Sequence, residues 1–257
     1  MKPLDNLLLR KLLLHIPADY LWSDAGIVRI GAARDIAAYA IGDFRGKCLI
    51  FCHGNGETAV SERYWFEQLS KAGVSVICPD YRGYGLSIGE LSEEGCYVVA
   101  HAAYAYLVQE RQVSPRDIVV LGYSLGSAVA VELSVAEPTG GLILQTPFAD
   151  GRKLLRAWAS KLGRVLSVVG WLASFLPISC PFPTSSRLGR VSVPVLVIHG
   201  TADSIVPYSH GLEVFRRITV ANKRFVSVDG AGHCNLQYFL GEKYVPLLVD
   251  FIQDGEC

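Results

Sequence analysis

The stretch "IVVLGYSLGSAVAVELS" (residues 118–134) decides the fold, because it changes character at a single serine. Residues 118–121 are apolar and β-branched, which predicts a strand that is buried on both faces. Residues 124–136 are rich in helix-forming residues and predict a helix. Gly122 and Gly126 flank Ser124, and glycines allow a tight turn to bring neighbouring backbones together. The pattern therefore predicts a strand, a sharp turn that exposes the Ser124 hydroxyl, and a helix.

A second Gly-x-Ser-x-Gly match occurs at residues 85–89 and contains Ser87. The residues before it, "DYRGYG", form a glycine-punctuated loop, and those after it, "GELSEEG", are typical of a turn that leads to a helix cap. Ser87 thus lacks the flanking strand and helix that a nucleophilic serine at such a turn requires. We predict that Ser124 is the nucleophile and that Ser87 belongs to the scaffold or to the rim of the site.

Apolar strand-like runs alternate with helical segments along most of the chain. Strands are predicted at residues 26–30, 36–41, 48–52, 74–78, 118–121, 142–144, 193–198 and 225–228, and helices at 60–71, 93–109, 124–136, 209–218 and 238–251. The first two strands alternate in polarity, as antiparallel edge strands do, whereas the later ones are continuously apolar. The pattern predicts an α/β fold with a doubly wound, mostly parallel, eight-stranded sheet.

The bulk composition limits the class of protein. With 257 residues and 51% hydrophobic content, the chain is predicted to form a single domain over residues 1–257. Lys plus Arg equals Asp plus Glu at 24 each, so no basic surface indicates a nucleic-acid partner. The seven cysteines show no spacing typical of a metal site or a disulfide framework. We therefore expect buried, reduced thiols, no metal and a cytoplasmic location.

Two segments depart from the regular alternation of strands and helices. Residues 147–192, after the sixth strand, are too many for one crossover helix and predict a small helical flap over the ends of the strands. The N-terminal residues "MKPLDNLLLRKLLLHIP" lack a cleavage site for a signal peptide. They are predicted to form a short helix that packs on the body or rests on a membrane surface, so peripheral membrane contact is one possible interaction.

A nucleophilic serine needs a base and an acid, supplied by loops at the carboxyl ends of later strands. His233 follows the last strand in a glycine-rich loop, "DGAGH", and is the predicted base. Asp203 follows the penultimate strand and is the preferred acid, because a carboxylate there can orient the imidazole. Asp150 also follows a strand and remains an alternative, whereas Asp229 is too close to His233 along the loop.

The negative charge that develops on a substrate oxygen needs two N–H donors. The backbone N–H of Leu125 is one predicted donor, and the glycine-rich loop "HGNGE" supplies the second from Asn55, with Gly54 or Gly56 as alternatives. This loop lacks the Gly-Lys-Ser/Thr ending of a nucleotide-binding loop, so no cofactor is expected.

Five motifs in one order, "HGNGE", "DYRGYGLSIGE", "GYSLGSAVA", "VPVLVIHGTADSIVP" and "GAGHCNL", make the chain resemble the α/β-hydrolase superfamily. Within it, the chain is most similar to the serine-aminopeptidase-like branch and to small esterases, thioesterases and lipases such as the alpha/beta hydrolase domain-containing 13 and 17 proteins. The resemblance implies a triad of Ser124, Asp203 and His233 and an oxyanion hole from the backbone of Asn55 and Leu125.

The resemblance implies a serine hydrolase that cleaves a small-molecule carboxylic ester or thioester. An aminopeptidase is disfavoured, because Asp150 is the single acid in the predicted flap, which carries several Lys and Arg residues. An apolar, mildly basic flap suits an acyl chain. Two alternatives remain: an acyltransferase that uses the same triad, and a hydrolase-like binding protein without activity.

Overall fold

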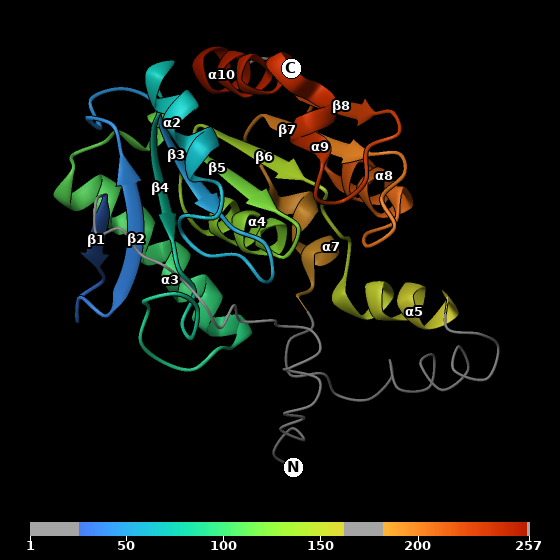
Figure 1. The fold of residues 1–257 in the computed structure, drawn as a ribbon, viewed down its shortest axis with the longest axis horizontal. Helices are drawn as coiled ribbons and strands as arrows, with labels where there is room; N and C mark the ends of the chain where they lie inside the picture. Colours follow the sequence, from blue (N-terminus) through green and yellow to red (C-terminus); the bar gives the residue numbers. More distant parts are fainter. Residues whose placement is uncertain (1–25, 162–181, 256–257) are drawn as a thin grey trace.

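The computed structural model describes residues 26–161 and 182–255. Their centre is an eight-stranded sheet with the strand order β1-β2-β4-β3-β5-β6-β7-β8 (Figure 1). The strands are β1 Ile27–Ile30, β2 Ile36–Ile41, β3 Cys48–Cys52, β4 Ser75–Pro79, β5 Ile118–Tyr123, β6 Gly141–Gln145, β7 Val195–Gly200 and β8 Lys223–Val228. β1 pairs antiparallel with β2, and β2 antiparallel with β4, while the remaining neighbours are parallel. The predicted fold class is confirmed.

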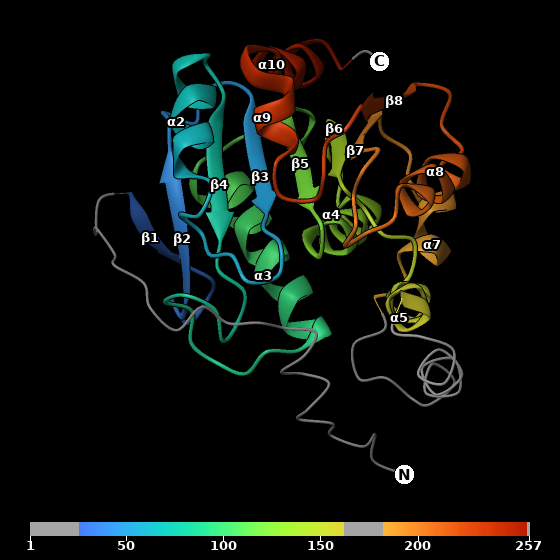
Figure 2. The same cartoon turned by 45° about the vertical axis from the view of Figure 1, so that its right-hand side comes forward.

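Helices cover both faces of the sheet (Figure 2). They are α2 Arg63–Lys71, α3 Glu93–Ala105, α4 Gly126–Ala136, α5 Gly151–Lys161, α7 Thr184–Arg187, α8 Tyr208–Arg217, α9 Leu236–Leu240 and α10 Tyr244–Asp254. Successive strand residues point to opposite faces. On β3, Leu49 and Phe51 join the core beneath α2 and α10, whereas Ile50 joins the core beneath α3 and α4. This two-sided burial explains why the strand sequences are continuously apolar.

Two details of the predicted elements are wrong, and a third differs in its last turn. The last helix, predicted as one segment, is two helices, because Gly241 has a positive φ of 54° and ends α9. β2 is not an edge strand: β4 pairs with its second side, and Ile36–Tyr39 are buried. The predicted helix at 93–109 changes to a π-helical turn at Tyr106–Glu110. These differences depend on tertiary pairing and backbone geometry that local sequence patterns do not encode.

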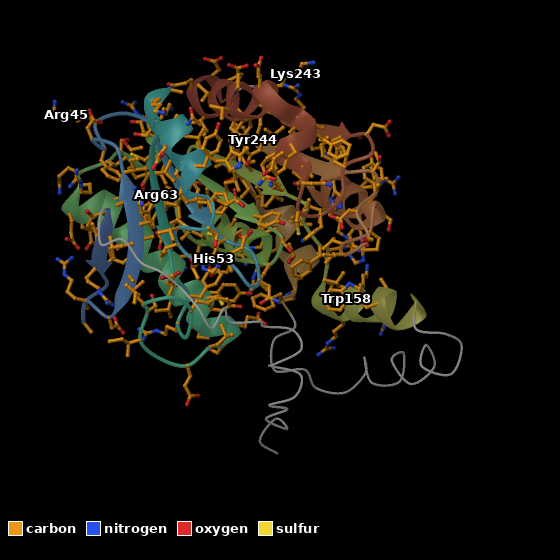
Figure 3. The ribbon with its side chains drawn as sticks, viewed as in Figure 1. Arg45, His53, Arg63, Trp158, Lys243 and Tyr244 are labelled. Atoms are coloured by element: carbon orange, nitrogen blue, oxygen red, sulfur yellow. The ribbon has the colours of Figure 1, made fainter. Side chains whose placement is uncertain are left out.

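The predicted flap is described in part. After β6, helix α5 extends beside the ends of the strands and carries Trp158 on its described part (Figure 3). Residues 162–181 of the insertion and the predicted N-terminal helix lie outside the described residues. Within the described ranges, no helix has the length and apolar character that crossing a bilayer requires.

Candidate active site

Ser124 lies at the turn between β5 and α4, as the sequence predicts. Its φ of +50° is a left-handed conformation that costs a non-glycine residue about 1–3 kcal/mol. Three hydrogen bonds hold the turn: the Ser124 N–H donates to Gln145 O at 3.0 Å, and the N–H and hydroxyl of Ser127 donate to Ser124 O at 3.0 and 2.6 Å. A Cβ atom on Gly126 would lie 1.9 Å from Cys52 O, so only glycine fits there.

The His233 imidazole bridges Ser124 and Asp203. Its Nε2 lies 2.8 Å from the Ser124 Oγ, and its Nδ1 lies 2.7 Å from the Asp203 Oδ2. All three residues are provided by segments at the carboxyl ends of β5, β7 and β8, although 109 residues separate Ser124 from His233. With Nδ1 donating to the carboxylate, Nε2 is free to accept the proton of the hydroxyl.

The Asp203 carboxylate is fixed on both oxygens. Its Oδ1 accepts the N–H groups of Ile205 and Val206 at 2.9 and 2.8 Å. Burial alone raises the pKa of Asp203, but hydrogen bonds from His199 and His233 outweigh it and hold that pKa well below its usual range. Asp203 is therefore ionised at neutral pH, so its negative charge faces the imidazole of His233.

A second imidazole, that of His199, approaches the same carboxylate from inside the fold. The His199 side chain is fully buried, with its Nε2 3.0 Å from Val206 O and 3.5 Å from Asp203 Oδ2. Because Nε2 faces two acceptors, it carries the proton. A Cβ on Gly211 would lie 2.3 Å from His199 Nδ1, so that glycine makes room for the ring. Sequence reasoning missed this contact, although the spacing "HGTAD" puts both residues at one strand end.

The competing acids have other partners. Asp150 Oδ1 accepts the N–H groups of Arg152 and Lys153 at the start of α5, and Asp229 Oδ1 accepts the hydroxyl of Thr201. Both carboxylates thus stabilise local backbone or loop structure. Among the described residues, neither Asp150 nor Asp229 forms a hydrogen bond or an ion pair with His233.

The second serine motif has a scaffold geometry. The Ser87 hydroxyl is buried, donates to Asp80 O at 2.7 Å and accepts the N–H of Ala37 at 2.9 Å. The Asp80 carboxylate accepts the N–H groups of Ala59 and Leu86, and burial raises its pKa to about 6. Ser87 thus joins the loop to β2, in agreement with its predicted scaffold role.

The predicted donors to the oxyanion both line one pocket with Ser124. Leu125 follows Ser124 directly, and Asn55 lies in the loop after β3, where the Tyr84 hydroxyl donates to its Oδ1 at 2.8 Å. The alternative donor Gly54 is already engaged, because its N–H donates to Glu57 Oε2 at 2.8 Å. Of the three residues predicted from the sequence, Asn55 and Gly56 thus remain as candidates for the second oxyanion donor.

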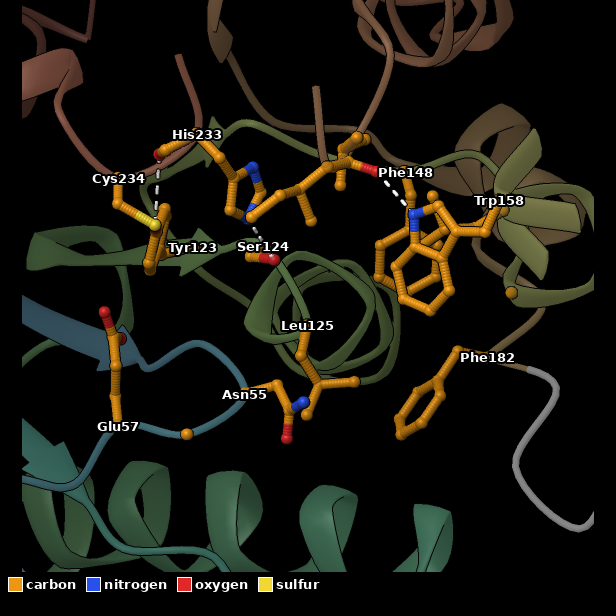
Figure 4. Close-up of a pocket in the computed structure, with 15 residues that line it drawn as sticks. Asn55, Glu57, Tyr123, Ser124, Leu125, Phe148, Trp158, Phe182, His233 and Cys234 are labelled. Atoms are coloured by element: carbon orange, nitrogen blue, oxygen red, sulfur yellow. Dashed lines mark hydrogen bonds between the residues drawn. The ribbon is translucent and has the colours of Figure 1, made fainter. Parts of the chain in front are cut away.

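The pocket has a volume of about 410 Å³ and a mostly apolar wall on one side of Ser124 (Figure 4). This wall consists of Leu125, Phe148, Leu154, Trp158, Phe182 and Val206. The Trp158 indole N–H donates to Ile205 O at 2.7 Å, which ties α5 of the flap to the loop after β7. The flap therefore contributes directly to the site.

Two further lining residues, Glu57 and Cys234, were not singled out from the sequence. Burial, together with the nearby Glu62 carboxyl, raises the pKa of Glu57 to about 8. Cys234 is exposed, contrary to the expectation that the cysteines are buried. Their positions directly after "HGNG" and "GAGH" were the available signal. Within 26–161 and 182–255, no group of three or more His, Cys, Asp or Glu side chains is arranged to hold a metal.

Comparison with known proteins identifies the class. The model of the alpha/beta hydrolase family matches residues 49–238, so the chain belongs to this family. The matched region contains Ser124, Asp203 and His233 and the loop with the predicted oxyanion donor Asn55.

Particular relatives refine this assignment. The chain is 35% identical over 191 residues to the uncharacterized protein Rv2307c of Mycobacterium tuberculosis, covering 73% of this chain and 63% of the relative. It is 30% identical over 207 residues to human alpha/beta hydrolase domain-containing protein 17C, covering 79% and 57% of the two chains. The match thus spans less than two thirds of these relatives. These similarities agree with the branch that the sequence motifs indicate.

Solved structures share the fold. The Pyrococcus furiosus esterase Pf2001 superposes with a TM-score of 0.75 at 20% identity, covering 95% of this chain and 98% of that one. The Paleococcus ferrophilus monoacylglycerol lipase superposes with a TM-score of 0.63 at 19% identity, covering 86% and 99%. The chain thus belongs to the alpha/beta hydrolase family and shares its fold with these two solved structures.

Proposed function

We propose that this protein is a serine hydrolase that cleaves a carboxylic ester or thioester through an acyl-enzyme, with Ser124, His233 and Asp203 as its triad. The observation that carries the proposal is the continuous chain of short contacts from Ser124 Oγ through His233 to Asp203, 2.8 and 2.7 Å long. It opens on a pocket large enough for an acyl chain. A serine hydroxyl becomes nucleophilic only with such a base in reach.

The proposed reaction has two halves. His233 Nε2 takes the Ser124 proton as Oγ attacks the acyl carbon, and the backbone N–H groups of Asn55 and Leu125 stabilise the oxyanion. The imidazolium then protonates the departing alcohol or thiol, which leaves the acyl group on Ser124. A water molecule loses its proton to His233 and attacks the acyl carbon, and release of the carboxylic acid restores the hydroxyl.

The apolar wall supports an acyl substrate. Phe148, Trp158 and Phe182 lie together on one side of Ser124, where a hydrocarbon chain gains about 25 cal/mol for each Å² removed from water (Figure 4). An esterase and a monoacylglycerol lipase have the same fold, which is compatible with this substrate class. The proposed partner is therefore a small acyl ester or thioester.

The test compares the two serine motifs. Ser124→Ala is expected to abolish both the hydrolysis of p-nitrophenyl butyrate and the labelling by a fluorophosphonate probe, because the nucleophile is removed. Ser87→Ala is the matched control and is expected to keep both signals, since its hydroxyl bonds to scaffold backbone. Loss of activity in Ser87→Ala with retention in Ser124→Ala would refute the assignment. Adding alcohols and analysing the products distinguishes hydrolysis from acyl transfer.

A further inference from the structure

The pocket has two chemically different ends, with Ser124 between them (Figure 4). Phe148, Trp158 and Phe182 form the apolar end, whereas Glu57, Tyr123 and Cys234 lie on the other side of the serine. An ester bound with its acyl carbon at Ser124 extends in two directions from that atom. If the acyl chain fills the apolar end, the leaving group lies at the end that contains Glu57.

Glu57 is held in place by its own loop. Its Oε2 accepts the N–H of Gly54 at 2.8 Å, and its own N–H donates to Gly54 O. Among the described residues, the second carboxyl oxygen, Oε1, has no hydrogen-bond partner, which leaves it available to a bound molecule. A second cleft adjoins the polar end of the pocket, because Cys234 lines both; Trp65 and Gln237 also line this second cleft. A leaving group therefore has room to extend.

The groups around Glu57 favour its neutral form. Burial is the main cause that raises its pKa, the Glu62 carboxyl is a second cause in the same direction, and the Gly54 N–H opposes them; together they bring the pKa to about 8. The hydroxyls of Tyr123 and Tyr244 and the thiol of Cys234 also face this region from β5, α10 and the loop after β8. Among the described residues, no Lys or Arg contributes to the shift, so the neighbouring groups favour the uncharged acid at neutral pH.

We propose that this polar end is the leaving-group subsite and that Glu57 determines whether a neutral or a cationic leaving group is preferred there. A neutral alcohol or thiol portion with an acceptor atom takes a hydrogen bond from its carboxyl group, and a cationic portion is attracted by its carboxylate. The proposal rests on the proposed hydrolase function and adds the specificity of its second subsite. Because the carboxyl group ionises at mildly alkaline pH, the preference for cationic leaving groups increases with pH.

Two substrates with one acyl group isolate this effect. Butyrylcholine has a trimethylammonium group where neohexyl butyrate has an uncharged tert-butyl group of the same shape. The ratio of their kcat/KM values cancels the titration of the triad, which both substrates share. In the wild type, we expect this ratio to rise about tenfold between about pH 6 and about pH 9.5, since a carboxylate attracts the cation. The midpoint is expected near pH 8, where Glu57 ionises.

Glu57→Gln is the informative variant, because its amide oxygen can still accept the Gly54 N–H while the side chain stays neutral. Its ratio is expected to stay at the low-pH value throughout. Glu62→Gln is the matched control: its ratio still rises, with a midpoint at lower pH, because the neighbouring carboxyl that raises the pKa of Glu57 is gone. A flat ratio in the wild type, or a rise that persists in Glu57→Gln, overturns the proposal.

A binding measurement separates this proposal from the proposed function. Ser124→Ala lacks the nucleophile, so the affinity of butyrylcholine for it can be measured by calorimetry at both pH values. We expect tighter binding at the higher pH, and no such gain in the Ser124→Ala/Glu57→Gln double variant. If the wild type hydrolyses neither ester, the proposed function fails, while the calorimetric difference still supports the charge-sensing role of Glu57. An affinity that is independent of pH refutes that role even if hydrolysis occurs.

Discussion

Replacing Asp203 with Asn tests the candidate triad most directly, because the change keeps the size of the side chain while it removes the negative charge and turns one hydrogen-bond acceptor into a donor. In the structure, Oδ2 lies 2.7 Å from His233 Nδ1 and 3.5 Å from His199 Nε2, while Oδ1 accepts the N–H groups of Ile205 and Val206. An asparagine has one acceptor and one donor group for these two positions. Either orientation of the amide therefore sets donors against donors.

The amide orientation of lower free energy, with the NH₂ group toward His233, determines the expected kinetic result. Turning the amide NH₂ toward Ile205 and Val206 leaves buried N–H donors unsatisfied, at about 1–3 kcal/mol each. Turning it toward His233 instead forces the imidazole to accept at Nδ1, so its proton moves to Nε2. A protonated Nε2 cannot accept the Ser124 hydroxyl proton. We expect kcat/KM for p-nitrophenyl butyrate to fall about 10,000-fold, equivalent to about 5 kcal/mol of transition-state stabilisation.

Asp150→Asn is the matched control, because Asp150 is the other acid that the sequence allowed. Its Oδ1 accepts the N–H groups of Arg152 and Lys153, and an amide oxygen can do the same, so kcat/KM is expected to change less than about twofold. Thermal unfolding of both variants checks that the fold persists. If Asp203→Asn keeps more than a tenth of the wild-type kcat/KM, Asp203 is not the acid of a working triad. The same conclusion follows if Asp150→Asn loses more activity than Asp203→Asn does.

Two further variants examine the surroundings of the triad. His199→Phe removes an N–H donor from Asp203, and a carboxylate with fewer hydrogen bonds holds an imidazolium more tightly; the acid limb of the pH profile of kcat/KM should move to higher pH by about one unit. An unmoved limb with lower stability would mean a purely structural role. Trp158→Ala should lower kcat/KM about tenfold or more for long acyl chains and little for acetyl esters, because the indole forms part of the apolar wall. An equal loss across a chain-length panel would place the acyl chain elsewhere.

The parts of the site that were predictable have local signals. Ser124 is marked by the strand, glycines and helix around it, and His233 by a glycine-rich loop after the last strand. Each signal needs only neighbouring residues and the rule that functional loops meet at the carboxyl ends of strands. The structure brings Ser124, His233 and Asp203 together as predicted.

The missed features depend on distant neighbours. His199 contacts Asp203 through a ring whose space exists because position 211 is glycine. The raised pKa of Glu57 arises from burial, with the Glu62 carboxyl as a further cause. Likewise, the interior position of β2 follows from its pairing with β4, which alternation in one strand cannot reveal. Each requires knowledge of which segments are adjacent in space.

The second serine motif has a physical explanation in this geometry. Its loop contains Tyr81 and Tyr84, whose hydroxyls donate to His53 O at 3.0 Å and to Asn55 Oδ1 at 2.8 Å. Both tyrosines are fully buried, so the loop braces the segment that carries the proposed oxyanion donor. The glycines of "DYRGYGLSIGE" serve this packing: a Cβ on Gly85 would lie 2.1 Å from the Asp80 carboxylate.

The same segment also fixes the serine elbow. The carbonyl groups of Cys52 and His53 fill the space where Gly126 would have a Cβ atom, at 1.9 and 2.8 Å. The end of β3 and the start of α4 are therefore in direct contact. A shift in either segment would move Asn55 relative to Leu125, and oxyanion stabilisation needs both donors within about 3 Å of one oxygen. The two Gly-x-Ser-x-Gly motifs thus contribute to the same site. The motif at Ser124 presents the hydroxyl, and the loop of the motif at Ser87 supports the Asn55 loop beside it.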